Sequence, residues 1–132
     1  MSTAPSLENV EYDTHAPVMD REQIDMLIMS DAGDADTSLA KELFELFASE
    51  SSGKLDGLAE ICASGDLRAF RDVIHFVAGS AGNLGLARLA AFYRGIECAV
   101  DEGCLKDITG VEDVVRGEFE IALEAFKADF EF

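Results

Sequence analysis

His75 is the residue whose type and surroundings best suit it for chemistry. It follows Ile74, a member of a regular apolar stripe, so its imidazole is predicted to lie at the edge of the buried face. Arg71 and Gly79 lie one helical turn before and after it. A glycine inside a helix costs roughly 1 kcal/mol relative to alanine, and Gly79 removes the side chain that would stand beside the imidazole. The pattern predicts a ring nitrogen open to a partner molecule, although a histidine at a helix edge can also be an ordinary boundary residue.

Two predicted helices position this histidine. In the first, apolar residues alternate steps of three and four, as in the core stripe of a helical bundle. These residues are Leu67, Phe70, Ile74, Val77, Ala81 and Leu84. After a Gly-Asn-Leu-Gly turn, the rhythm continues through Leu86, Leu89, Tyr93, Ile96 and Val100. Gly103 is expected to end this second helix. The pattern predicts an antiparallel helical hairpin.

The segments around the hairpin also predict helices. Asp20 is placed to cap a short helix that buries Ile24, Leu27 and Ile28. A further helix is expected from Ser38 to about Ala63, with a bend or break at residues 51–53. Its apolar residues Leu39, Leu43, Leu46, Phe47, Leu55, Leu58 and Ile61 keep mostly to one face.

The sequence also predicts the boundaries of the later helices. Gly65 is expected to end one helix and Asp66 to cap the next, and a last helix runs from about Val111 to Phe130. The predicted fold class is all-α. We expect an antiparallel four-helix bundle with a short additional N-terminal helix over residues 18–132, preceded by a polar arm of residues 1–17.

The charge of the chain limits its partners. A formal net charge of −17 on 132 residues argues against nucleic-acid binding. Residues 67–96 hold four arginines against one acid, a local charge of +3, so the rest carries −20. This clustering indicates either chance or a docking face for an acidic or phosphorylated partner. No apolar run approaches the ~20 residues of a membrane span, and the N-terminus lacks the pattern of a secretory signal. We expect a cytoplasmic protein without a membrane partner.

Other site chemistries are weakly represented. Cys62, Cys98 and Cys104 form no metal-binding pattern; we expect reduced thiols packed as small hydrophobic residues, with a redox sensor as the alternative. A carboxylate-bridged metal centre in a bundle needs two Glu-x-x-His pairs. The sequence offers one Asp72-x-x-His75 and otherwise only His15. We therefore expect no metal site. The sequence has no glycine-rich loop of the kind that binds nucleotides, so we also expect no nucleotide site.

The stretch from His75 to Leu89, HFVAGSAGNLGLARL, resembles the signature of histidine phosphotransfer (HPt) domains. In that family a histidine is followed by Lys-Gly-Ser, then by Leu-Gly and a hydrophobic residue. A weaker resemblance extends over about residues 18–130. It implies that His75 is the phosphorylated histidine and that Gly79 gives a receiver domain access to it. Ser80, with Leu84 and Gly85, matches positions that end the histidine helix and turn the hairpin.

The resemblance also implies supporting roles. Glu97, twenty-two residues after His75, falls where the family often has Gln or Glu within bonding reach of the imidazole. A carboxylate that accepts a hydrogen bond from Nδ1–H would leave Nε2 as the nucleophile. Without the resemblance, Glu97 is an ordinary solvated acid. Arg68, Arg88 and Gly82 are expected to lie on the docking face.

Position 78 departs from the family pattern, because Ala78 stands where the family usually has lysine. That lysine is expected to steady the phosphoryl oxygens. Arg71 could take its place, since a guanidinium binds phosphate oxygens in bidentate fashion. It could equally pair with Asp72 or face solvent.

The function implied is that of a monomeric phosphocarrier, not an enzyme with its own nucleotide site. It would carry a phosphoryl group on His75 to and from aspartates of response-regulator receiver domains, supplied through a hybrid sensor histidine kinase. No cofactor is expected on this chain; Mg²⁺ is expected on the partner receiver domain. The alternative is an HPt-like binding module that docks on a kinase or response regulator without carrying phosphate.

Overall fold

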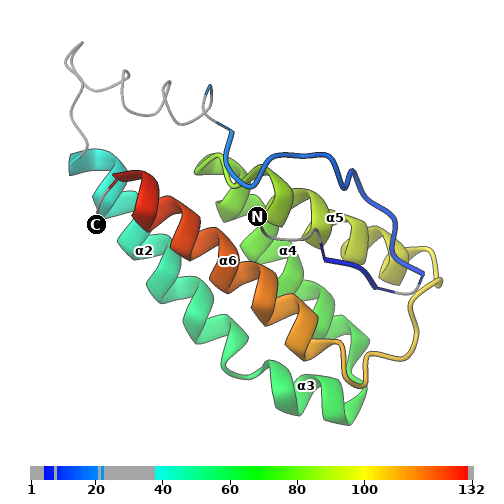
Figure 1. Ribbon diagram of the computed structural model, residues 1–132. Coiled ribbons are helices and arrows are strands. Elements are labelled where there is room, and N and C mark those ends of the chain that lie inside the picture. The colour runs from blue at the N-terminus through cyan, green and yellow to red at the C-terminus, as the bar shows by residue number, and fades with distance from the viewer. Residues whose placement is uncertain (1–4, 8, 21, 23–37, 131–132) are drawn as a thin grey trace.

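The computed structural model describes residues 5–7, 9–20, 22 and 38–130. Every regular element in these ranges is a helix, which confirms the predicted all-α class (Figure 1). The helices are α2 (Ser38–Leu55), α3 (Leu58–Ser64), α4 (Leu67–Asn83), α5 (Ala87–Asp101) and α6 (Glu112–Phe130). The predicted short helix after Asp20 lies outside the described residues. In the described ranges no helix has both the length and the apolar character to span a bilayer.

The hairpin of α4 and α5 is the most extensively packed pair of helices. Gly65 ends α3 in the left-handed conformation, with φ of 72°, and the Asp66 side chain accepts a hydrogen bond from the amide of Ala69 at 3.1 Å. Both predicted boundary roles are confirmed. Gly85 turns the hairpin with φ of 75°, a conformation that glycine adopts without strain.

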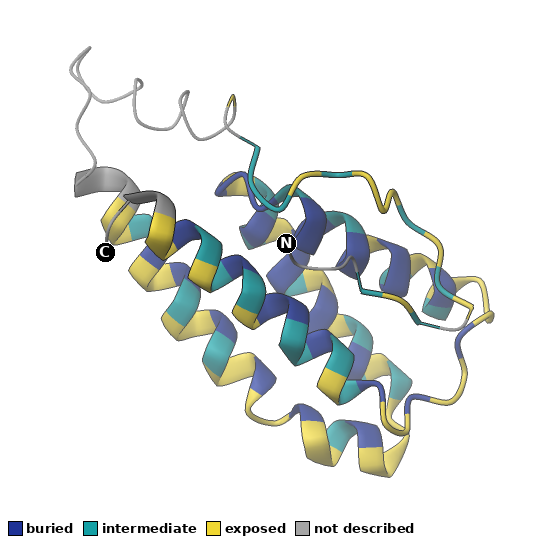
Figure 2. Cartoon of the chain, in the orientation of Figure 1, coloured by how far each residue is buried: buried dark blue, intermediate teal, exposed yellow. Residues whose placement is uncertain are grey.

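The long helices lie beside one another (Figure 1). α2 packs on α4, α5 packs on α6, and the short α3 contacts both α4 and α6. Phe44 of α2 stacks on Phe126 of α6, with ring centroids 4.6 Å apart. Figure 2 shows buried residues on all five helices, with long buried stretches along α4 and α5. The predicted stripe of α4 is buried except at its first residue, Leu67, which is half-buried.

The region of α2 and α3 differs from the sequence-based prediction. The helix continues through residues 51–53 and is interrupted only after Leu55. Ser51 is fully buried and lies on the inward face of α2. Leu46, which was expected to share the apolar face of this helix, is 56% exposed, while Phe44 and Phe47 are buried.

The described part of the N-terminal arm lies along α5 (Figure 1). The amide of Asp20 donates to the carbonyl of Gly85 at 2.7 Å, and the amide of Arg88 donates to the carbonyl of Pro17 at 2.9 Å. Further along, the Tyr12 ring packs on Phe92, with centroids 5.1 Å apart. The arm therefore covers a further face of α5, in addition to the faces that pack on α4 and α6.

Candidate functional site

His75 projects from the middle of α4 at the edge of the core. Its side chain is 67% exposed, whereas the preceding Ile74 is fully buried. Gly79 is exposed, and a Cβ built on it would have no atom within 4 Å. The surface beside the imidazole is therefore open, as the sequence predicted.

Glu97 of α5 holds one side of the imidazole. Its Oε1 lies 2.8 Å from Nδ1 of His75, and its side chain is only 15% exposed. An ionised carboxylate can only accept a hydrogen bond, so a neutral His75 carries its proton on Nδ1 in this contact. That tautomer leaves the lone pair on Nε2 available.

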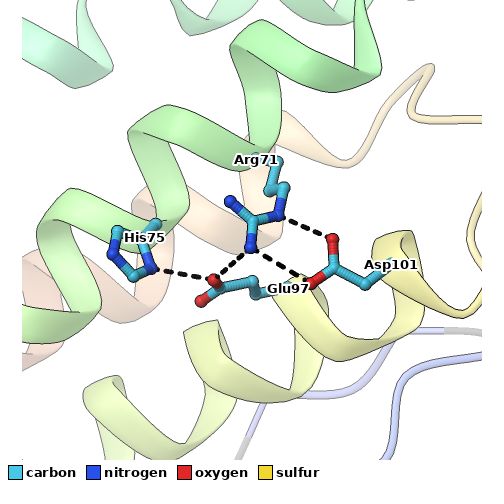
Figure 3. A network of polar contacts seen from close by, with 4 residues as sticks. All are labelled: Arg71, His75, Glu97 and Asp101. Carbon is cyan, nitrogen blue, oxygen red and sulfur yellow. Dashed lines mark hydrogen bonds and ion pairs between the residues drawn. The ribbon is translucent and has the colours of Figure 1, made fainter.

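Arg71 anchors Glu97 from the other side (Figure 3). One guanidinium nitrogen, Nη2, lies 3.0 Å from the same Oε1 of Glu97. The guanidinium also donates to Asp101, from Nε to Oδ1 at 2.6 Å and from Nη2 to Oδ2 at 3.2 Å. Asp72, which the sequence offered as a partner of Arg71, is not the carboxylate that Arg71 binds. Asp101 was not among the predicted site residues, although it lies one turn beyond Glu97 on the same helix face.

The ion pair of Arg71 and Asp101 shifts both of their pKa values. The hydrogen bond from Arg71 lowers the pKa of the Asp101 carboxyl, and the same bond raises the pKa of Arg71. Both groups therefore stay charged at neutral pH, and polar contacts run without a break from Asp101 through Arg71 and Glu97 to the imidazole of His75.

A cavity of about 300 Å³ opens beside His75 between α4 and α5. Ala78, Gly79 and Arg94 contribute to its wall, as do Glu97, Cys98 and Asp101. Ala78 is only 2% exposed, so its methyl group forms part of the floor. The cavity is large enough for a phosphoryl group.

The remaining predicted site residues lie in different parts of the structure. Gly82 lies beneath Arg94, since a Cβ built on it would be 3.3 Å from Nη2 of that arginine. Arg68 is exposed in the first turn of α4. Ser80 is half-buried and faces a different cavity, which α4 shares with α2.

Arg88 is not on the surface, so the prediction that it belongs to the docking face is wrong. Its guanidinium forms two hydrogen bonds to Glu118 of α6, at 2.8 and 2.9 Å. The two side chains are 6% and 0% exposed. Desolvation of a lone arginine would be very costly, and the buried carboxylate of Glu118 is what allows this position. A sequence alone does not show that a partner lies on another helix.

The three cysteines are free thiols. Cys62 is buried, and this burial raises the pKa of its thiol. Cys98 and Cys104 are exposed, so the prediction that they pack as small hydrophobic residues is wrong for these two. Across the described residues, no group of three or more His, Cys, Asp or Glu side chains is arranged to hold a metal ion.

A bundle with an exposed histidine, held by a carboxylate of the adjacent helix, is the arrangement that the HPt signature implies. The family model of the Hpt domain matches residues 42–129. The chain therefore belongs to the Hpt domain family, whose role is phosphotransfer in two-component signalling. Searches of curated proteins and of solved structures find no significant match.

Proposed function

We propose that this protein carries a phosphoryl group on Nε2 of His75, between aspartates of receiver domains in a phosphorelay. The observation that carries the proposal is the 2.8 Å contact between Nδ1 of His75 and Glu97. It orients the ring and leaves Nε2 as the free nucleophile on an exposed side chain.

The proposed transfer needs no proton to move. The Nε2 lone pair of neutral His75 forms the N–P bond as the P–O bond of the receiver's aspartyl phosphate breaks. The bonding electrons leave with the aspartate carboxylate. The phosphorylated ring becomes a cation that keeps its Nδ1 proton, and the Glu97 carboxylate facing that proton stabilises the new charge. The reverse step returns the phosphoryl group to a second receiver, so positioning is the main contribution of this chain.

The roles of the partners and the state of this chain are further parts of the proposal. A hybrid sensor histidine kinase would supply phosphate, the partner receiver would bring Mg²⁺, and this chain would act as a cytoplasmic monomer without a cofactor or nucleotide site of its own. For the architecture of the described helices, we propose an antiparallel four-helix bundle, and the packing of α4 on α5, α2 on α4 and α5 on α6 supports it.

Ala78 favours a second candidate function. Because it lacks the lysine charge that the family signature has at this position, the chain could dock on a kinase or response regulator without carrying phosphate. In this binding module His75 would serve only as a contact residue.

Incubation with a phosphorylated receiver domain distinguishes the two functions. The phosphocarrier becomes labelled, and the label is acid-labile and alkali-stable, as expected for a phosphoramidate. His75→Gln and His75→Ala should abolish labelling but leave the melting temperature nearly unchanged, because the side chain is mostly exposed. Unlabelled wild-type protein that still binds the receiver would establish the binding module, and labelling that survives both substitutions would place the phosphate elsewhere.

A further inference from the structure

The contacts between α4 and α5 define an antiparallel register. Arg71 faces Asp101, and one turn further along α4, His75 faces Glu97. A Cβ built on Gly82 would lie 4.0 Å from the Cβ of Ala90, which extends the same register to the end of α4. In this register, the pair that falls between His75–Glu97 and Gly82–Ala90 is Ala78 of α4 with Arg94 of α5. Arg94 therefore stands on α5 opposite the position where the family signature has its lysine.

Arg94 also reaches across to α4. Its Nη2 would lie 3.3 Å from a Cβ at Gly82, one turn beyond Ala78 on the histidine helix. It lines the same cavity as His75, Ala78 and Gly79. His75 and Arg94 thus line one cavity, and the small residues Ala78 and Gly79 form part of its α4 wall.

The two candidate cations, Arg71 and Arg94, differ in whether a carboxylate already pairs with them. Arg71 is bound by Asp101 and Glu97, so its charge is already matched by two carboxylates. Arg94 is exposed and takes part in none of the ion pairs found in the described part of the chain. A phosphoryl group brings a charge of about −1.5 to −2 and three acceptor oxygens, which a guanidinium can bind in bidentate fashion.

We propose that Arg94 binds the phosphoryl oxygens on His75 and replaces, from the opposite helix, the lysine that Ala78 lacks. This inference rests on the proposed phosphocarrier function. Arg71 then acts as a positioning residue through Glu97, and the cation that meets the phosphate comes from α5. A lysine at position 78 and an arginine at position 94 would be two alternative ways to charge one cavity.

Two phosphodonors test the proposal. Phosphoramidate, a small donor, reports on the cavity alone, whereas a phosphorylated receiver also requires docking. Arg94→Ala should slow labelling of His75 about ten- to hundredfold with both donors, as expected when a charge-assisted hydrogen bond is lost. Arg94→Lys should retain much of the rate. Lys127→Ala, an exposed cation removed from α6, is the matched control and should label normally.

A compensating substitution gives the sharper result. Ala78→Lys should restore much of the labelling rate to Arg94→Ala, but should not rescue Arg71→Ala, whose defect lies in the placement of Glu97. Equal labelling rates for Arg94→Ala and Lys127→Ala with phosphoramidate would overturn the proposal. This holds even if the phosphorylated receiver labels Arg94→Ala more slowly, because Arg94 would then act only in docking. Failure of Ala78→Lys to rescue Arg94→Ala would also overturn it. If the wild-type protein is not labelled by either donor, the phosphocarrier function itself fails.

Discussion

Glu97 and His75 are joined by a single hydrogen bond of 2.8 Å that links the two helices of the hairpin. The Glu97 oxygen in this bond also lies 3.0 Å from the guanidinium of Arg71. Two donors therefore converge on one oxygen, and the carboxylate has little freedom to rotate away from the imidazole. The orientation of His75 depends on this shared acceptor.

Substitutions at Glu97 should follow hydrogen-bonding capacity more than charge. Glu97→Gln keeps an oxygen that can accept from Nδ1–H, so phosphoryl uptake should fall only a few-fold. Glu97→Ala removes the acceptor and should reduce uptake about tenfold or more, given ~1.5–3 kcal/mol for a hydrogen bond to a charged group. Labelling rates and the ¹⁵N shifts of the His75 ring provide the measurement, with Glu120→Ala of α6 as control. Equal losses in both variants would show that the negative charge matters and the acceptor does not.

Gly79 should be replaceable for folding but not for docking. Gly79→Ala and Gly79→Leu should stabilise the protein by up to about 1 kcal/mol in denaturant unfolding, because an exposed helical glycine is replaced by better helix formers and nothing lies within 4 Å of the added Cβ. Gly79→Leu should nevertheless slow labelling by a phosphorylated receiver, since the side chain would stand beside the imidazole.

Gly53 offers the matched control for this substitution. It is an exposed glycine inside α2 that also has nothing within 4 Å of a built Cβ, and it lies outside the cavity. Gly53→Leu should change stability in the same direction and leave the labelling rate unaltered. Normal labelling of Gly79→Leu would mean that receivers do not approach His75 from this side.

The sequence predicted the hairpin well because its information is local. The three-and-four spacing of α4, the Gly65-Asp66 boundary and the turn at Gly85 each depend on neighbours in the chain, and all three hold. The network at His75 was only partly predictable. Glu97 came from the resemblance to HPt domains, while Asp101 as the partner of Arg71 depends on the register between two helices.

Periodicity also predicts only one buried face for each helix. The arm packs on a further face of α5, which includes Phe92 and Gly95. Nothing in the polar composition of the arm indicates where its described residues pack. The failed prediction for Arg88 has the same origin, because its burial is set by Glu118 on a distant segment.

Gly95 should be required for the arm to lie on α5. A Cβ at this position would be 2.6 Å from the carbonyl oxygen of Glu11 and 3.0 Å from the Cβ of Tyr12, so Gly95→Ala must displace the backbone of the arm. We expect faster cleavage after Glu11 by a glutamate-specific protease, with helical content unchanged. Gly117→Ala in α6 has nothing within 4 Å and should leave the cleavage rate as in the wild type. A Gly95→Ala protein that resists the protease equally would show that the arm can adjust without detaching.

Arg88 and Glu118 should determine stability and not partner binding. Removing one member of a buried ion pair leaves the other charge uncompensated, at a cost of about 3–5 kcal/mol. Arg88→Ala and Glu118→Ala should each lower the free energy of unfolding by about this amount in urea titrations. The double substitution Arg88→Met with Glu118→Leu replaces the pair by apolar groups of similar size, and should recover most of the loss because neither charge is left buried.

At temperatures where it is folded, the double variant should take up phosphate from a receiver at the wild-type rate, whereas Arg68→Glu, at an exposed position on α4, should slow uptake in a salt-dependent manner. Slow uptake by a fully folded double variant would return Arg88 to the docking surface and contradict its assignment as an interior residue.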